Sequence, residues 1–580
     1  MKFIRSPRLS TKLLEFRFHM RSLRSIIVAF AFFVLLSPSL PAQGPQPVTI
    51  HVHFDHAQGT FPAVWSYFGY DEPNYTYTPN GKKLLHELSS LSPVPVYVRV
   101  HNLLTTGDGS ASLKWGSTNA YTEDPRGNPV YNWDIVDRIF DTFPEAGIKP
   151  LVEVGFMPQA LSTHPEPYRH NFPQGSIFTG WAYPPKDYKK WAELVFQFAR
   201  HLRQRYGDAE VRTWLWEIWN EPDIDYWKGT PEEFLKLYDF SADAILRALP
   251  EARIGGPDTT GPARPKAAQF LTQFLQHCDN GQNYATGKRG GPLDFISFHP
   301  KGSPTWQTDH VQMGISTQLT AIDQGFKIVA SFPKWKNTAI ILGESDPEGC
   351  AACSAQQNPQ NAYRNGPLYA SYTAESFHHI LALAVRYHTN FAGAVTWAFE
   401  FEDQPYFAGF RELASNGLDK PVLNAFRMFG LLGTERVEVT SSGALATSEV
   451  VVKGVRGQPE INADATRSAH GLEILIWNYH DDDLPATPSS IDVAVSGLPV
   501  ESKRAWLEHF RIDSDHSNAF ADWQKMGSPQ PPSTSQFHSL EAAGQLQLLD
   551  SPSWIHLDHG TTHVQFVLPR QALSLIRLGW

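Results

Sequence analysis

Two glutamates that end apolar segments are the residues best placed to do chemistry in this chain. Glu221 follows a Trp-rich apolar run within Asn220-Glu221-Pro222, and Glu344 ends a second apolar run. Two facing carboxyl groups can hydrolyse a glycosidic bond, because one protonates the leaving oxygen while the other attacks the anomeric carbon or activates water. The pair therefore predicts glycoside hydrolysis, provided that the fold brings both segments together.

The residues around Glu221 strengthen this interpretation. An isolated glutamate at a strand end is more often a surface or salt-bridged residue. Asn220 can hydrogen-bond a sugar hydroxyl, and Pro222 disfavours the right-handed helical conformation at Glu221. Three tryptophans just before this motif are expected to form an aromatic platform near the site; they are Trp214, Trp216 and Trp219.

The elements that must position these residues form a repeated pattern between residues 60 and 430. Eight apolar or β-branched runs alternate with amphipathic helical stretches, which is typical of βα units on a parallel sheet. The runs lie near residues 65–70, 96–100, 148–154, 214–219, 253–256, 294–299, 339–344 and 394–399. The sequence thus predicts an α/β fold, a (β/α)8 TIM barrel, whose active site lies at the C-terminal ends of the strands.

The pattern of apolar and polar residues changes after about residue 430. Short alternating segments separated by Gly, Pro, Ser and Asp predict an accessory β-sandwich. These segments are residues 437–440, 449–455, 472–477, 491–495, 563–568 and 572–578. We therefore expect a catalytic barrel over residues 43–430 and a sandwich over residues 431–580, and residues 47–56 alternate in a way that can supply the sandwich with another strand.

The N-terminus has the pattern of a secretory signal. Seven basic residues precede the apolar run 26–36, and a small-residue site ends at Ala42. We expect residues 1–42 to be removed and the protein to be exported to the periplasm or the extracellular space, with no later membrane-spanning segment. Met20 would begin a more ordinary signal than Met1, so the sequence leaves the start codon open.

Charge and cysteine content limit the partners. The formal net charge of −10 becomes about −16 without residues 1–42, and no basic run follows, which argues against a nucleic-acid partner. A small carbohydrate or oligosaccharide is the expected partner, and both a monomer and a homo-oligomer are compatible with the sequence. In an exported protein, Cys350 and Cys353 are expected to form a local disulfide, and Cys278 to be a buried apolar residue.

Several motifs resemble glycoside hydrolase family 39, which includes β-xylosidases and α-L-iduronidases. In the predicted barrel they are residues 97–102, 131–133, 154–158, 216–223 and 294–299, and beyond it residues 419–422, 511–519 and 523–529. The resemblance therefore covers most of the chain after the predicted signal.

The resemblance implies a retaining enzyme with a barrel and an accessory sandwich. It assigns Glu221 as the acid/base and Glu344 as the nucleophile, and implies no metal and no cofactor. His101 and His299 match positions that contact the sugar. Asn220 and Trp397 complete the residues expected to bind substrate around the reacting bond.

The substrate is less clearly indicated. Lys301 matches a lysine that binds the uronate carboxylate in iduronidases, and Arg411 can supply a second cation, which favours a uronide. The Lys-Gly pair at this position also resembles bacterial β-xylosidase-like members, in which the lysine can pair with a nearby acid or a sugar hydroxyl. Acidic residues near the eighth run can instead neutralise both cations; they are Glu400, Glu402 and Asp403. With the acidic surface, this favours a β-xylosidase that releases xylose from xylo-oligosaccharides. The alternatives are an α-L-iduronidase-like or other family 39 glycosidase and, from another class, a non-catalytic carbohydrate-binding protein.

Overall fold

The computed structural model describes residues 46–172, 175–178 and 180–580. Residues from Pro47 to Trp580 form one compact unit. The predicted signal peptide lies outside the described residues. Within the described ranges, no helix combines the length and the apolar character needed to cross a membrane.

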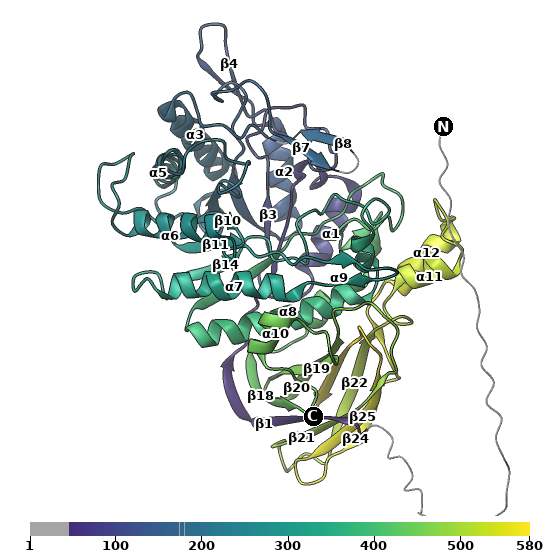
Figure 1. Cartoon of the computed structure of the whole chain (residues 1–580). Coiled ribbons are helices and arrows are strands. Elements are labelled where there is room, and N and C mark those ends of the chain that lie inside the picture. Colours follow the sequence, from purple (N-terminus) through teal and green to yellow (C-terminus); the bar gives the residue numbers. More distant parts are fainter. Residues whose placement is uncertain (1–45, 173–174, 179) are drawn as a thin grey trace, which may run out of the picture. The chain divides into compact units, whose positions relative to one another are not determined.

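The first part of this unit is the predicted barrel (Figure 1). Eight parallel strands close on themselves in chain order, and each predicted run contributes one strand. They are β2 (Tyr67–Tyr70), β3 (Tyr97–Val100), β6 (Lys149–Val154), β9 (Leu215–Ile218), β10 (Arg253–Thr260), β11 (Phe295–His299), β14 (Ala339–Leu342) and β15 (Asn390–Thr396). The barrel is confirmed, although the last strand begins and ends earlier than expected.

Helices follow the strands along the chain. They are α1 (Pro79–Ser89), α2 (Asp134–Glu145), α3 (Tyr188–Tyr206), α4 (Asp208–Val211), α5 (Pro231–Ala248), α6 (Pro265–Asn280), α7 (Ile315–Ala330), α8 (Pro367–Tyr387) and α9 (Pro421–Gly430), with short 3-10 helices at Pro73–Tyr75 and Pro359–Asn365. In α5, Thr230 and Glu233 form a capping box and Pro231 is the first residue, so the helix starts where its sequence predicts. Its apolar side, with Phe234 and Leu237, is fully buried.

The second part is a mixed sheet. It comprises β18 (Glu435–Ser441), β19 (Glu460–Arg467), β20 (Gly471–Tyr479), β21 (Ser489–Ser496), β22 (Arg504–Ile512), β24 (Ser553–His556), β25 (Thr562–Leu568), β26 (Leu573–Gly579) and the short β23 (Gln547–Leu548). The early strand β1 (Val48–Thr60) pairs antiparallel with β18 and parallel with β21. Strands from distant places in the sheet order, such as β20 and β21, share one apolar core, as in a sandwich.

Strand β20 joins the two parts because both of its faces are buried. Ile474 and Ile476 belong to the core of the sandwich, whereas Leu475 and Trp477 belong to the apolar cluster of the barrel. Successive side chains of a strand point to opposite faces, so one apolar strand serves both cores. The sandwich is therefore packed against the barrel through a continuous apolar contact.

One predicted strand is wrong. Residues 449–455 were expected to be β because they lie among the short alternating segments after residue 430, but residues Thr447–Lys453 form the helix α10. Val450 and Val451 are buried while Val452 is 75% exposed, and Thr320 of α7 donates a hydrogen bond to the Val451 carbonyl. Packing against α7 thus outweighs the β propensity of valine.

Smaller elements complete the fold. They are the helices α11 (Ala519–Lys525) and α12 (Thr534–Ala543) and four two-stranded ribbons, β4 (Tyr121–Glu123) with β5 (Pro129–Tyr131), β7 (Arg169–Phe172) with β8 (Gly175–Phe178), β12 (Thr305–Trp306) with β13 (Val311–Gln312), and β16 (Ala414–Ser415) with β17 (Leu418–Asp419).

Candidate active site

The two predicted carboxylates meet at the C-terminal ends of the barrel strands. Glu221 follows β9, Glu344 follows β14, and His299 ends β11 between them. His299 Nδ1 lies 2.9 Å from Glu221 Oε1 and 3.7 Å from Glu344 Oε1. A carboxylate oxygen of Glu221 and one of Glu344 lie within 4.8 Å of each other. The structure thus brings together the pair on which the sequence analysis depends.

The backbone that carries these glutamates is tightly constrained. Trp219 and Glu221 have φ angles of 72° and 42°, in the left-handed region that costs energy for a residue with a side chain. The Glu221 N–H donates to the Asp258 carbonyl at 2.9 Å, which helps to hold this conformation. At Gly343, a Cβ would lie 2.1 Å from an Asp258 carboxylate oxygen, so the residue before Glu344 has no room for a side chain.

Positive groups surround Glu344. Lys301 Nζ lies 2.6 Å from Glu344 Oε2 and 2.8 Å from Asp346 Oδ2, and His101 Nε2 lies 3.6 Å from Glu344 Oε1. Burial alone would raise the pKa of Glu344, but Lys301, His299 and His101 outweigh burial and lower that pKa well below its usual range. Glu344 is therefore a carboxylate at neutral pH.

A buried ionic network that the sequence analysis missed lies beneath the site. The Arg99 guanidinium contacts Glu153 at 2.9 Å, Glu217 at 2.5 Å and also Asp258. All four side chains are fully buried. Arg99, Glu153 and Glu217 are each flanked by apolar residues within a barrel strand, and this signal was present in the sequence. The network fixes the strand ends that carry the site.

His299 is part of this network. Its Nε2 lies 2.7 Å from Asp258 Oδ2, and its ring is fully buried. Burial lowers the pKa of His299, but Asp258 and Glu344 reverse this and raise it to about 10. His299 hydrogen-bonds Glu221 through Nδ1 and forms an ion pair with Asp258 on its other side, so it holds Glu221 in place relative to the barrel.

His101 is held on its other side by residues that were not predicted. Its Nδ1 lies 2.9 Å from Asp71 Oδ1 and its Nε2 lies 2.8 Å from Glu153. Asp71 also contacts Lys114 Nζ at 2.6 Å and accepts from Trp397 Nε1 at 3.3 Å. Against the effect of burial, Glu153 and Asp71 raise the pKa of His101 to about 9. Trp397 is 1% exposed and its ring packs 4.5 Å from the His101 ring, so it supports this histidine.

Asn220, the residue directly before Glu221, is 1% exposed, and its side-chain oxygen accepts a hydrogen bond from Arg99 at 3.2 Å.

The predicted aromatic platform is wrong: Trp214, Trp216 and Trp219 are all fully buried. The first two rings pack against Phe140 and Phe198, respectively. These two tryptophans therefore fill the barrel core, and Trp219 donates its indole N–H to the Tyr226 carbonyl.

Arg411 is fully buried and does not line the pocket. Its Nη1 lies 2.8 Å from Glu348, and its Nε donates to the Trp397 carbonyl at 2.9 Å. The expected neutralisation of Lys301 and Arg411 by acids of the eighth run is wrong, because Asp346 and Glu348 contact these cations instead. Glu400 and Glu402 accept hydrogen bonds from the backbone N–H groups of Gly417 and Asn80, respectively.

The loop after β14 contains the predicted disulfide. Cys350 and Cys353 are bonded to each other, and Arg364 donates to both of their carbonyls, at 2.7 and 2.6 Å. Cys278 is a free, buried cysteine, as expected. The loop that follows Glu344 is thus braced by a covalent bond and an arginine.

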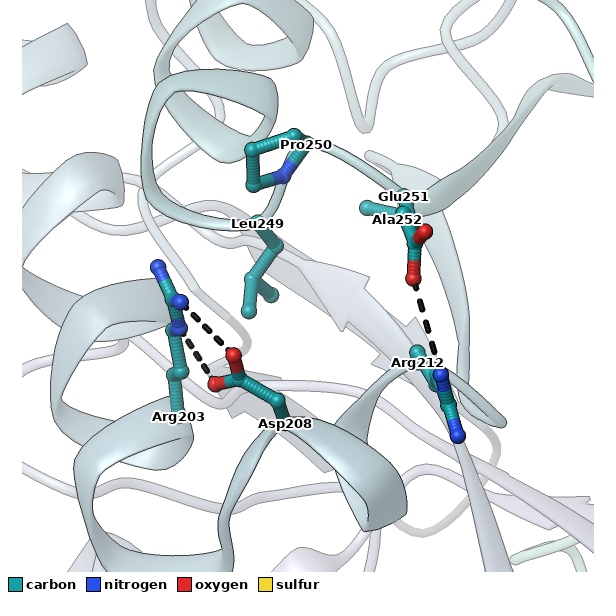
Figure 2. A pocket seen from close by; sticks show the side chains of 7 residues that line it. All are labelled: Arg203, Asp208, Arg212, Leu249, Pro250, Glu251 and Ala252. Atoms are coloured by element: carbon teal, nitrogen blue, oxygen red, sulfur yellow. Dashed lines mark hydrogen bonds and ion pairs between the residues drawn. The ribbon is translucent and has the colours of Figure 1, made fainter.

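A pocket of about 330 Å³ opens at Glu221. Its lining includes Glu221, His299 and Lys301 and continues along the end of β10 and the starts of α6 and α7. A second hollow of about 310 Å³ lies before β9 and β10, at the opposite end of the strands (Figure 2). Its charged residues are paired, Arg203 with Asp208 and Arg212 with Glu251. Catalytic residues of such barrels lie at the other end, so the first pocket is the candidate site.

The donor atoms of Glu221, His299 and Glu344 lie close enough together to hold a metal ion. Lys301, however, already places a positive charge 2.6 Å from Glu344. A cation would therefore meet electrostatic repulsion there. The chemistry of the site is better described by its carboxylates and ammonium group than by a metal.

Known proteins with similar sequences share this fold. Residues 95–549 match the model of Glycosyl hydrolases family 39. A β-xylosidase of Geobacillus stearothermophilus is 26% identical over 497 residues, which cover 83% of this chain and 86% of that protein. The human α-L-iduronidase is 29% identical over 384 residues, 61% of this chain and 55% of that protein. The crystal structure of a monomeric β-xylosidase from Caulobacter crescentus matches with a TM-score of 0.70 and 21% identity, covering 92% of this chain and 99% of that one.

Proposed function

Because the chain belongs to glycosyl hydrolase family 39, we propose that it is a retaining exo-β-xylosidase that releases xylose from xylo-oligosaccharides. The observation that carries the mechanism is the separation of the two carboxylates, with oxygens within 4.8 Å of each other. Retaining glycosidases hold their carboxyl groups about 5 to 5.5 Å apart, whereas inverting enzymes need roughly 6.5 to 9.5 Å to admit a water molecule.

In the first step, Glu344 attacks the anomeric carbon and the glycosidic bond breaks. Glu221 gives its proton to the leaving oxygen, and the sugar remains as an ester of Glu344. Lys301 and His101 keep Glu344 ionised before this attack. Once the ester forms, the negative charge of Glu344 is gone, and Glu221 acts as a base for the water that releases the sugar.

His299, His101 and Asn220 position this pair. The 2.9 Å contact of His299 with Glu221 Oε1 leaves the second carboxyl oxygen to carry the transferred proton. Asn220 and His101 lie beside the two glutamates and can meet the hydroxyls of the sugar. We propose the predicted substrate-binding role for these three residues, and a supporting role for Trp397 and Arg411.

A neutral pentoside fits the charge distribution better than a uronide. Lys301 is already paired with Glu344 and Asp346, and Arg411 is buried against Glu348. A uronate carboxylate would have to compete with these acids for a cation. An α-L-iduronidase-like activity is the second candidate, because Lys301 lines the pocket beside the nucleophile.

Initial rates on aryl β-D-xyloside and α-L-iduronide, measured side by side, test the substrate. Faster xyloside cleavage supports the proposal, whereas faster iduronide cleavage replaces it with the second candidate. NMR of the first product tests the mechanism, because a retaining enzyme releases β-xylose from a β-xyloside. Release of α-xylose would overturn double displacement. Binding of sugars without turnover would favour a non-catalytic carbohydrate-binding protein.

A further inference from the structure

The pocket that opens at Glu221 extends away from the reacting pair along one wall of the barrel mouth. Ile224 and Tyr226 follow Glu221, and Gly261, Ala263 and Arg264 follow β10. Ser303 and Thr317 line the same pocket from beyond β11 and from α7. An acid that protonates the glycosidic oxygen must face the departing group, so this pocket lies where the leaving group would emerge.

Arg264 differs from the other cations near the site. Lys301, Lys114 and Arg99 each have a carboxylate oxygen within 3 Å. The Arg264 side chain is exposed and, within the part of the chain that the structure describes, makes no hydrogen bond or ion pair. Its backbone is held in place, because its N–H donates to the Gly261 carbonyl at 3.0 Å and Pro265 follows it. Arg264 therefore lines the pocket and carries a guanidinium that has no partner among the described residues.

The rest of the lining suits a saccharide. Ser303 Oγ and Thr317 Oγ1 lie 2.8 Å apart, so one of the two hydroxyls keeps a hydrogen to donate to a ligand. Tyr226, Ile224 and Ala321 provide apolar surface for the carbon face of a sugar ring. By contrast, Thr260 is bonded through its hydroxyl to Asp223 at 2.5 Å and is not available.

We infer that the part of this pocket lined by the segment after β10 and by Ser303 and Thr317 is the leaving-group subsite, and that Arg264 makes it selective for a saccharide that carries a carboxylate. The inference rests on the proposed glycosidase function and adds the class of the leaving group. A guanidinium binds a carboxylate through two parallel hydrogen bonds, and this short-range contact acts despite the acidic net charge of the protein.

The test compares two disaccharides that share the same scissile bond, xylosyl-β-1,4-glucose and xylosyl-β-1,4-glucuronate, whose leaving rings differ only in a hydroxymethyl or a carboxylate group. For wild type we expect kcat/KM to favour the glucuronate substrate by about two- to fivefold at low salt, the range of an exposed ion pair. The preference should disappear in Arg264→Gln, persist in Arg264→Lys and shrink as salt is added.

Lys266→Gln is the matched control, because Lys266 is exposed in the first turn of α6, two residues after Arg264, but does not line the pocket. This variant should keep the preference for the glucuronate substrate. A wild-type ratio of one or less, an unchanged ratio in Arg264→Gln, or an equal loss in Lys266→Gln would overturn the role of Arg264. Failure to cleave any xyloside would instead overturn the proposed function on which the subsite depends.

Discussion

Two clusters in this chain are built from the same three side chains, a histidine between two glutamates. At the barrel mouth these are Glu221, His299 and Glu344, and at the junction of barrel and sandwich they are Glu375, His379 and Glu460. In each cluster the ligand atoms lie within 4.8 Å of one another. Residue types and distances are thus nearly alike, although the mouth cluster opens into a pocket and the junction cluster is fully buried.

The surroundings of the junction cluster make it a structural contact. His379 Nε2 lies 3.1 Å from both glutamates, one on α8 and one on β19. Trp477 Nε1 donates to Glu375 at 2.6 Å, and Thr447 Oγ1 lies 3.0 Å from His379 Nδ1. Burial and the Glu460 carboxylate raise the pKa of Glu375 to about 8, so this carboxyl holds a proton at neutral pH.

Charge and access, more than residue types, decide what such a cluster does. At the mouth, Lys301 is close to Glu344 and keeps it ionised. At the junction, no lysine or arginine among the described residues forms an ion pair with Glu375, and burial favours its protonated form. One cluster therefore holds an ionised carboxylate, the proposed nucleophile, and the other joins two parts of the fold.

The same substitution in both clusters should have opposite results. Glu344→Gln should lower kcat by at least about 10³-fold, because an amide cannot replace an ionised nucleophile. Glu375→Gln should leave kcat within about twofold, since glutamine mimics the protonated carboxyl. Initial rates and melting temperatures of both variants provide the measurement. Comparable losses of kcat in two folded variants would remove the distinction between the clusters.

The next largest effect is expected at Glu221 and depends on the leaving group. Glu221→Ala should reduce kcat/KM by about 10²- to 10⁴-fold for poor leaving groups that need a proton. Activated aryl glycosides should lose much less. A series of aryl xylosides with different leaving-group pKa values measures this dependence. A loss that is uniform along the series would show that Glu221 is not the acid.

The barrel and the proximity of Glu221 and Glu344 were predictable from the sequence because each depends on a local pattern. An apolar strand that ends in a polar motif marks both Glu221 and Glu344, and parallel strands place such ends together. The partners of Lys301 and Arg411 were predicted wrongly, since charge pairing depends on loops whose paths the local pattern does not determine. The prediction of an aromatic platform was wrong because the side chains of Trp214 and Trp216 are buried in the core.

The junction cluster had no comparable signal. Glu375 and His379 are four residues apart on α8, a spacing that is common on any helix, and Glu460 is distant in the sequence. Their meeting depends on how β19 packs against α8, which is a tertiary contact. The helix α10 shows the same limit, because packing against α7 determined its conformation.

The junction histidine His379 should contribute to stability but not to turnover. His379→Leu leaves two buried carboxyl groups without their shared partner, and we expect a loss of about 3 kcal/mol or more in the free energy of unfolding. The kcat of the folded variant should stay within about twofold of wild type, because α8 carries no residue of the site. Denaturant titration with tryptophan fluorescence measures the loss. The exposed His86 on α1 provides the control His86→Leu, which should change stability little.

The smallest expected effect is a pH dependence of stability that originates in the junction. Against burial, Glu375 and Glu460 raise the pKa of His379 to about 10, above the value of about 6.5 for an unfolded histidine. A raised pKa stabilises the folded state fully below pH 6.5, and this contribution is lost as the pH rises toward 10. Each proton retained only by the folded state changes the free energy of unfolding by about 1.4 kcal/mol per pH unit.

Glu375 adds to the same fall in stability with rising pH, because its pKa is also raised. The nearby His378 lowers the pKa of Glu460 and so also influences this pH dependence. The pKa values of His299 and His101 at the mouth are raised into the same range, so the pH profile of wild type alone does not give the contribution of the junction. The variant His379→Asn gives that contribution, because it removes the proton of His379 and leaves the mouth unchanged. The decline in stability between pH 7 and 9 should be shallower in this variant than in wild type. Parallel pH profiles would mean that the junction histidine is neutral in the folded protein, and the contrast between the two clusters would then rest on access alone.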